Sequence, residues 1–174
     1  MPNVNMRQWK NSDFELFALM NSNPDVMRYL NPLTRAESEQ LFEYIQKEID
    51  SYGWGIWAVE VDSVFAGMAG LHVPKWVTSF TPCTEALWRF RKEFWGSGVA
   101  YEASIQAIRY GFTQAKLDEI VTFTTPANYR SIKLIERLGF RREIENDFEH
   151  PEVSEDNPNR RHNFYRVTQA EFLY

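Results

Sequence analysis

The pattern of hydrophobic and polar positions predicts helices in the first third of the chain. Apolar residues recur at helical spacing over 13–20, and Ser12 and Glu15 have the spacing of a capping box. The same pattern, T-x-x-E, opens a longer amphipathic helix over 34–53. Between the two helices, Pro24 is expected to begin a short helical piece flanked by turns.

From residue 55 onward the pattern is that of strands alternating with helices. Two runs rich in β-branched and aromatic residues, 55–61 and 64–73, are separated by two polar residues, which predicts a β-hairpin. Further strands are expected at 85–90, 119–125, 140–147 and 162–168, and a short first strand at 3–9. Helices are expected at 98–116 and 129–139, and polar loops at 74–84 and 149–161.

This order of elements predicts one domain over residues 1–174, built on a mixed α/β (or α+β) sheet. The strand–helix–strand unit over 85–125 should place its two strands parallel in one sheet, through a right-handed crossover. The remaining strands can pair antiparallel, as in the expected hairpin.

Composition and charge argue against several classes of protein. The chain is 44% hydrophobic, which is enough to form a core, so disorder is not expected. A net charge of −5 argues against a nucleic-acid surface, and no apolar run approaches the roughly 20 residues of a membrane span. Cys83 has no second cysteine to pair with, and no Cys/His spacing suggests a metal site. The polar N-terminus lacks the apolar core of a signal peptide, which favours the cytoplasm.

The stretch W-G-S-G-V-A at 95–100 joins an expected strand to an expected helix. The first N–H groups of a helix have no internal partner and the helix dipole adds partial positive charge, so such a turn can hold a phosphate. A dinucleotide fingerprint needs a third glycine where Tyr101 stands, and the Walker A loop needs a lysine that is absent. On these residues alone, a glycine-rich turn without a ligand is an equal alternative.

A second motif lies downstream of this turn. Asn128 and Ser131 have the spacing N-x-x-S, and a predicted helix leads from them to L-G-F at 138–140. Together with W-G-x-G-x-A-x-E-A at 95–103, this resembles the GCN5-related N-acetyltransferase (GNAT) superfamily, and within it the RimJ/RimL-like branch. The resemblance implies a central mixed, mostly antiparallel sheet with two splayed parallel strands and about four helices. It also implies direct transfer of an acetyl group from acetyl-CoA to a primary amine, on a protein N-terminus or a small molecule.

The resemblance further implies where acetyl-CoA is bound. Backbone N–H groups of the glycine turn would hold the pyrophosphate, and the strand before it would pair with the pantetheine arm and stabilise the oxyanion. The N-x-x-S segment would line the opposite wall. The expected acetyl-CoA-binding residues are Trp88, Arg89, Phe90, Arg91, Trp95, Gly96, Ser97, Gly98, Val99, Ala100, Asn128 and Ser131.

Acetyl transfer to an amine needs a base for the amine and a proton for the thiolate. An alkyl ammonium is almost fully charged at pH 7, so a base must accept its proton. Glu85 is the first candidate, because carboxylates early on this strand fill the role in some relatives; a solvated strand-end carboxylate is the alternative. His72, which titrates near neutrality, is the second candidate, and a capped or exposed strand-end histidine is the alternative. Ser131 could protonate the thiolate, or it could only orient the start of its helix.

The last expected strand borders the acceptor site in relatives of this kind. Alternation puts His162 and Tyr165 on opposite faces, so both cannot serve the site equally. Trp76 and Phe80, in the loop before residue 85, could line an acceptor pocket or simply serve core packing. Cys83 could suggest a covalent acyl-enzyme, although the resemblance points to direct transfer.

Two positions depart from the family pattern. Trp95 stands where the superfamily has Gln or Arg, so pyrophosphate binding rests more on the backbone. Ile135 stands where a tyrosine acid is usual. These departures leave a non-catalytic acyl-CoA-binding or regulatory module as the alternative function, and a nucleotide-binding protein as a third. Dimers are frequent in the branch, so a homodimer is an open expectation.

Overall fold

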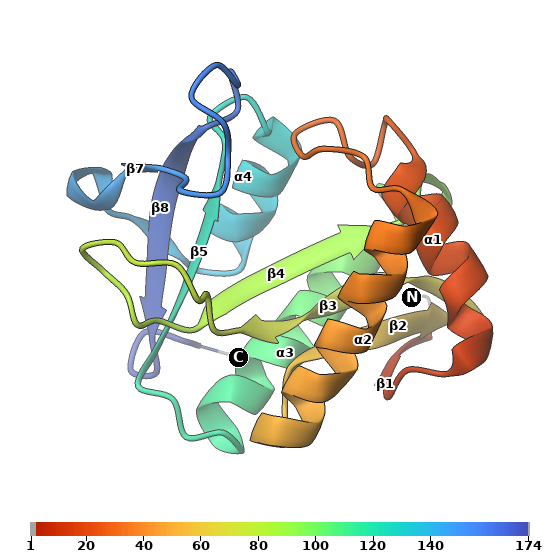
Figure 1. Ribbon diagram of the computed structural model, residues 1–174. Helices are drawn as coiled ribbons and strands as arrows, with labels where there is room; N and C mark the ends of the chain where they lie inside the picture. The colour runs from red at the N-terminus through yellow and green to blue at the C-terminus, as the bar shows by residue number, and fades with distance from the viewer. Residues whose placement is uncertain (1–2, 174) are drawn as a thin grey trace.

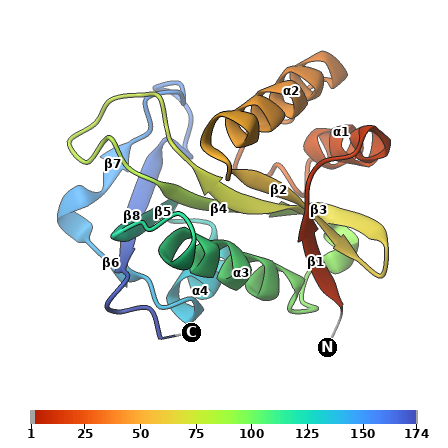
Figure 2. The same cartoon turned by 90° about the horizontal axis from the view of Figure 1, so that it is seen from below.

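The computed structural model describes residues 3–173, and in this range it shows an eight-stranded mixed sheet between two layers of helices. The strand order is β1-β2-β3-β4-β5-β8-β6, with β7 paired to β8. The strands are β1 (Val4–Arg7), β2 (Ile56–Val61), β3 (Val64–His72), β4 (Glu85–Phe90), β5 (Glu119–Thr124), β6 (Arg141–Arg142), β7 (Phe148–Glu149) and β8 (Arg161–Thr168). The helices are α1 (Phe14–Ser22), α2 (Arg35–Tyr52), α3 (Val99–Thr113) and α4 (Tyr129–Arg137). Helices α1 and α2 cover one face of the sheet, and α3 and α4 lie on the other (Figures 1 and 2). The predicted fold class is confirmed.

The parallel strands β4 and β5 meet at one end and then separate. Within residues 3–173, Glu85 and Val121 are their one register pair, and Val121 N donates to the carbonyl of Thr84 at 2.9 Å. Beyond this point the two strands diverge, as Figure 1 shows. All other strand pairs are antiparallel. The sheet therefore contains an internal gap, with the Glu85–Val121 contact at its vertex.

Helix α2 forms as its sequence predicts. The Thr34 hydroxyl accepts from Glu37 N, the Glu37 carboxylate accepts from Thr34 N at 2.7 Å, and Gly53 ends the helix at φ +74°. The buried stripe of α2 includes Ile45 and Ile49, which join an apolar cluster with β2 and β3. Helix α2 is thus held by its own caps and by burial of one face.

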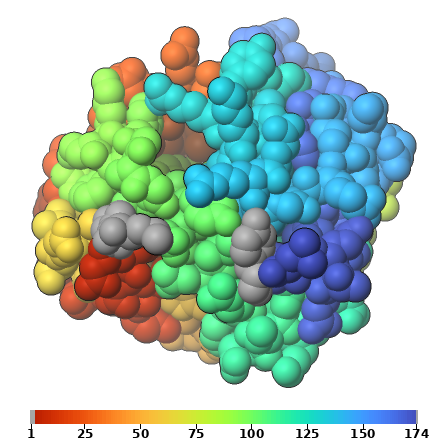
Figure 3. All heavy atoms as spheres, turned by 180° about the vertical axis from the view of Figure 1, so that it is seen from behind, coloured from red at the N-terminus to blue at the C-terminus, as the bar shows by residue number. Residues whose placement is uncertain are grey.

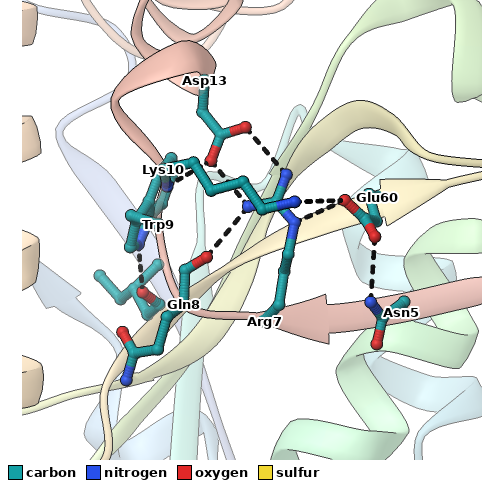
Figure 4. Close-up of polar contacts among 8 residues, drawn as sticks. Asn5, Arg7, Gln8, Trp9, Lys10, Asp13 and Glu60 are labelled. Carbon is teal, nitrogen blue, oxygen red and sulfur yellow. Dashed lines mark hydrogen bonds and ion pairs between the residues drawn. The ribbon is translucent and has the colours of Figure 1, made fainter.

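The start of α1 differs from the prediction, because the capping box expected of residues 12 and 15 does not form. A 3₁₀ turn precedes the helix, and the Asp13 carboxylate accepts from Lys10 N at 2.8 Å. Asp13 also pairs with Arg7 of β1 at 2.7 Å, and Arg7 pairs with Glu60 of β2 (Figure 4). The helix start is therefore set by Asp13 and its ion pair with Arg7 of β1, and not by Ser12, the capping residue that was expected.

Two further expectations are wrong. The segment after Pro24 forms consecutive turns rather than a helical piece. The expected strand 140–147 is limited to β6, then a 3₁₀ turn follows, and β7 lies partly in the expected loop. Ile144 is 69% exposed, so the segment has no buried face that would favour a strand. The Asp147 carboxylate accepts from Phe164 N at 3.0 Å, which turns the chain back onto β8.

Membrane insertion by a helix has no support in the described part of the chain. None of the helices within residues 3–173 has the length and apolar character needed to cross a bilayer.

Candidate active site

Beyond Glu85, the edge of β4 that faces β5 pairs with no described strand. The Thr84 carbonyl points toward β5, and period-two alternation puts the backbone groups of Trp88 and Phe90 on the same edge. The Phe90 carbonyl accepts from the indole N–H of Trp95 at 3.0 Å. Glu85–Val121 is the one register pair between β4 and β5 in the described residues, so no described strand pairs with Trp88 on this side. An extended ligand arm can therefore bind here as a strand would.

Arg89 in β4, and Arg91 directly after the strand, have their backbone groups on the other edge. Arg91 N donates to the Ala66 carbonyl at 2.9 Å, and Arg89 lies in register with Met68 of β3. The Arg91 side chain donates to the Phe65 carbonyl at 2.7 Å. Four consecutive positions, 88–91, were expected to bind acetyl-CoA through the backbone. The backbone groups of Trp88 and Phe90 thus face the gap, and those of Arg89 and Arg91 do not.

The glycine turn lies at the open end of this gap. Gly96 and Gly98 have φ values of +72° and +87°, and a Cβ built on either would meet no atom within 4 Å. Directly after them, Val99 is 1% exposed and packs into the core, which fixes the first turn of α3. The Ser97 hydroxyl donates to the Phe94 carbonyl at 2.6 Å. Open space in front of a rigid helix start fits the expected pyrophosphate.

The first turn of α4 forms the opposite wall. Asn128 Oδ1 accepts from Ser131 N at 3.3 Å, and Asn128 Nδ2 donates to Thr124 Oγ1 at 3.2 Å. The Arg130 guanidinium lies 4.7 Å from the centre of the Trp95 ring, which links α4 to the glycine turn. In Figure 3 the surface is hollowed between the green β4–α3 segment, the cyan α4 region and orange N-terminal segments.

Asn128, and not Ser131, therefore caps α4 with its side chain. Ser131 contributes its backbone N–H, and within residues 3–173 its hydroxyl has no hydrogen-bond partner. Ser131 is half-buried, so this hydroxyl can face a ligand in the gap.

Glu85 stands at the vertex of the gap. It pairs in register with Val121 of β5 and with His72 of β3. Burial raises the pKa of Glu85 to about 8, and the negative charge of Glu152 adds to the shift. A carboxyl group with this pKa exchanges its proton near neutral pH, which suits a general base.

His72, the second candidate base, lies directly across from Glu85. Residues opposite each other in an antiparallel pair share a face, so both side chains point toward the helix layer of α1 and α2. The Tyr44 ring of α2 is 6.2 Å from the His72 ring. Burial lowers the pKa of His72, which keeps the imidazole neutral over more of the pH range. The structure thus brings the two candidates together.

His162 and Tyr165 lie on opposite faces of β8, as alternation predicts. His162 is on the face of Glu85, and its Nδ1 donates to the Arg160 carbonyl at 2.9 Å. Tyr165 is 2% exposed and packs in the core with α3 and α4. Of the two, only His162 lies on the sheet face that carries Glu85 and His72.

Trp76 and Phe80 anchor the loop between β3 and β4 to this same face. Trp76 lies 5.6 Å from the Phe123 ring of β5, and Phe80 lies 4.6 Å from the Phe164 ring of β8. These contacts agree with the packing interpretation of both rings. Burial raises the pKa of Cys83 to about 12, so its thiol is not an available nucleophile at neutral pH.

A polar contact that the sequence did not reveal involves the side chain of Arg89. Arg89 Nη1 donates to Asn21 Oδ1, in the last turn of α1, at 2.6 Å. The two residues are 68 positions apart in the sequence, and no sequence motif contains both of them.

Comparison with known proteins agrees with this geometry. The family of acetyltransferase (GNAT) domains matches residues 3–141. The uncharacterized protein YkkB of Bacillus subtilis (strain 168) is 29% identical over 127 residues, which cover 71% of this chain and 73% of YkkB. The uncharacterized N-acetyltransferase p20 of Bacillus licheniformis is 28% identical over 146 residues, 80% of each chain.

Solved structures share the fold. A GNAT-family acetyltransferase from Bacillus anthracis superposes with a TM-score of 0.78 at 22% identity, over 98% of this chain and 100% of that one. The spermidine N-acetyltransferase of Vibrio cholerae, in complex with CoA and spermine, gives a TM-score of 0.74 at 20% identity, over 98% of both chains. The family match covers more than half of this chain, so the protein belongs to the GNAT acetyltransferases, enzymes that transfer an acetyl group from acetyl-CoA.

Proposed function

We propose that this acetyltransferase acts directly on a primary amine, of a protein N-terminus or a small molecule, with Glu85 as the general base. The observation that carries the proposal is the position of Glu85, a half-buried carboxylate whose pKa is raised by desolvation, at the vertex where β4 and β5 separate. In this proposal the thioester arm lies in the same gap, between the glycine turn and the α4 wall. The RimJ/RimL-like branch and the cytoplasmic location belong to this proposal, as do a single domain over 1–174 and the homodimer.

Backbone groups and side chains around the gap have separate tasks in this reaction. Acetyl-CoA supplies the activated acyl group. The N–H groups of Gly98 and α3 bind its pyrophosphate, and the Trp88 backbone holds the pantetheine arm and donates to the developing oxyanion. Glu85 takes the proton of the attacking ammonium, directly or through water. His72 lies beside Glu85 and is the alternative base.

Relatives of known activity support an amine as the acceptor. The Vibrio cholerae neighbour is a spermidine N-acetyltransferase. A curated relative from Aspergillus fumigatus, FsC-acetyl coenzyme A-N(2)-transacetylase, is 26% identical over 135 residues, 69% of this chain and 54% of that one. Both names describe transfer to nitrogen.

A thiol-release assay with a panel of amines tests the proposal. We expect CoA release that depends on both acetyl-CoA and an amine, and thermal stabilisation by CoA. Tight acetyl-CoA binding without turnover on any amine or N-terminal peptide would instead support the non-catalytic module. Stabilisation by ATP or NAD rather than CoA would support a nucleotide-binding protein.

Replacing Ser131 by Ala tests the proton donor for the thiolate. We expect kcat to fall about tenfold, a modest effect because CoA thiolate is a fair leaving group. The acetyl-CoA KM should hardly change, since the cap of α4 uses the backbone N–H of Ser131 and not its hydroxyl. Steady-state kinetics on the folded variant decides, and an unchanged kcat would remove Ser131 from the mechanism.

A further inference from the structure

Arg89 differs from the other arginines in its surroundings. Within residues 3–173 no carboxylate lies within ion-pair distance of it, although it is half-buried in β4. Desolvation by the surrounding protein lowers its pKa to about 10. The other arginines that lack a carboxylate partner are all exposed; they are Arg28, Arg109, Arg130 and Arg137. An enclosed cation without a counter-charge costs free energy unless an anion joins it.

The guanidinium of Arg89 also has unused hydrogen-bonding capacity. It carries five N–H donors, and the structure gives it one protein acceptor, Asn21 Oδ1. Because Arg89 remains partly accessible to solvent, a ligand group can reach these donors. A carboxylate matches the planar guanidinium with two parallel hydrogen bonds.

Arg89 shares a strand face with the proposed base. Alternation along β4 places Glu85, Leu87 and Arg89 on the side of α1 and α2, and Leu87 packs against the apolar cluster of these helices. The Cα atoms of Glu85 and Arg89 are about 13 Å apart along the strand. This face of β4 therefore has an acidic end, Glu85, at the vertex and a basic end, Arg89, toward the glycine turn.

We propose that Arg89, positioned by Asn21, binds a carboxylate of the acceptor, so that the acceptor is an amino acid-like molecule with its amine near Glu85. The proposal rests on the proposed N-acetyltransferase function and adds the substrate class. A zwitterionic acceptor matches both ends of the face: Glu85 takes the ammonium proton, and Arg89 compensates the negative charge. A polyamine, by contrast, would place a second cation beside Arg89.

A purely structural role for Arg89 is the competing explanation. Asn21 is fully buried, and its Nδ2 donates to the Ser38 hydroxyl of α2 at 3.3 Å, so Arg89, Asn21 and Ser38 connect β4, α1 and α2. This series of hydrogen bonds uses one of the five N–H donors of Arg89. A structural role predicts that a substitution harms all acceptors equally, whereas carboxylate binding predicts a selective loss.

The test compares acceptors that differ only in the carboxylate. Thiol release is measured with 4-aminobutanoate and 6-aminohexanoate, with the carboxamide of each, and with spermidine. We expect wild-type kcat/KM to favour each acid over its amide at least tenfold. In Arg89→Gln this preference should disappear through a 10- to 100-fold rise in KM for the acids, while the amides and acetyl-CoA keep their KM.

Two further variants serve as controls. Arg89→Lys keeps the charge but loses the planar fork, so its preference for acids should be intermediate. Arg109→Gln removes an exposed arginine of α3 that has no ion pair, and it should behave as wild type. If Arg89→Gln does not fold, the Lys variant and the wild-type acid/amide ratios still decide.

Two results would overturn the proposal. One is a wild-type enzyme that acetylates amides or spermidine as well as the acids; the other is an equal loss for acids and amides in Arg89→Gln. If no amine at all is acetylated, the proposed function fails, and calorimetry on the CoA-loaded protein decides about Arg89. Tighter binding of N-acetyl-6-aminohexanoate than of its amide would support the carboxylate site, and equal binding would contradict it.

Discussion

Replacing Glu85 by Gln is expected to lower kcat by about 10²- to 10⁴-fold, with the acetyl-CoA KM nearly unchanged. The amide has almost the same shape as the carboxyl group but cannot accept the proton of the attacking ammonium. Steady-state kinetics with saturating acetyl-CoA measures the loss. His72→Gln is the matched variant across the strand, and a larger loss in His72→Gln than in Glu85→Gln would reverse the assignment of the base.

The pH dependence of Glu85→Gln activity gives a second test of Glu85 as the general base. The carboxyl group must be ionised to act as a base, and its pKa is raised to about 8. The ratio of wild-type to Glu85→Gln activity should therefore rise with pH up to about 8 and level off above it. Taking this ratio cancels the titration of the acceptor amine. A flat ratio between pH 6 and 9 would argue against Glu85 as the base.

Glu85→Gln should also make the protein more stable above pH 5. The pKa of Glu85 in the folded state, about 8, exceeds the ordinary glutamate value of 4.5, so its contribution to stability is lost as pH rises through this window. Gln carries no such penalty. The Tm difference between variant and wild type should be near zero at pH 4 and grow steadily up to pH 8, at about 2–4 °C per kcal/mol.

Replacing Gly98 by Val is expected to raise the acetyl-CoA KM by about 10- to 100-fold while kcat changes little. The φ of +87° disfavours a β-branched residue, and the side chain would enter the open space in front of α3 where the pyrophosphate is proposed to bind. Kinetics at varied acetyl-CoA concentration, with calorimetry on CoA, measures the effect.

Gly53→Val is the matched control for this substitution. Gly53 has a similar φ of +74°, a Cβ there also meets no atom within 4 Å, and it lies at the end of α2 away from the glycine turn. Both variants should lose comparable stability, but only Gly98→Val should lose affinity for CoA. An equal KM in the two variants would show that the pyrophosphate lies elsewhere.

The sequence predicted those features that depend on local chemistry. The capping box of Thr34 and Glu37 forms because its partners are three residues apart, and Gly98 adopts a positive φ at the start of α3. The expected box at residues 12 and 15 fails because tertiary ion pairs compete: Asp13 pairs with Arg7, and Glu15 with Arg35. Ion pairs between separate elements leave no periodic signal in the sequence.

For the candidate site too, the sequence predicted the parts that depend on local motifs but not the parts that depend on packing. Motif spacing indicated the glycine turn and Asn128, and alternation placed His162 apart from Tyr165. The burial that raises the pKa of Glu85 depends on how β3, β5 and the loop around Glu152 meet, which no local pattern encodes. The Arg89–Asn21 contact depends on where α1 packs, and for the same reason it was not foreseen.

The free edge of β4 also bears on aggregation. An unpaired strand edge usually offers a template on which another chain can add a strand. Here the edge lies inside the sheet, with β5 on one side and the contact between Arg130 and Trp95 near its open end. A flexible, single-file arm fits such a gap more readily than a second polypeptide with side chains on both faces. The gap thus leaves backbone groups of β4 without a strand partner, yet it does not expose them as an edge on which a second molecule could add a strand.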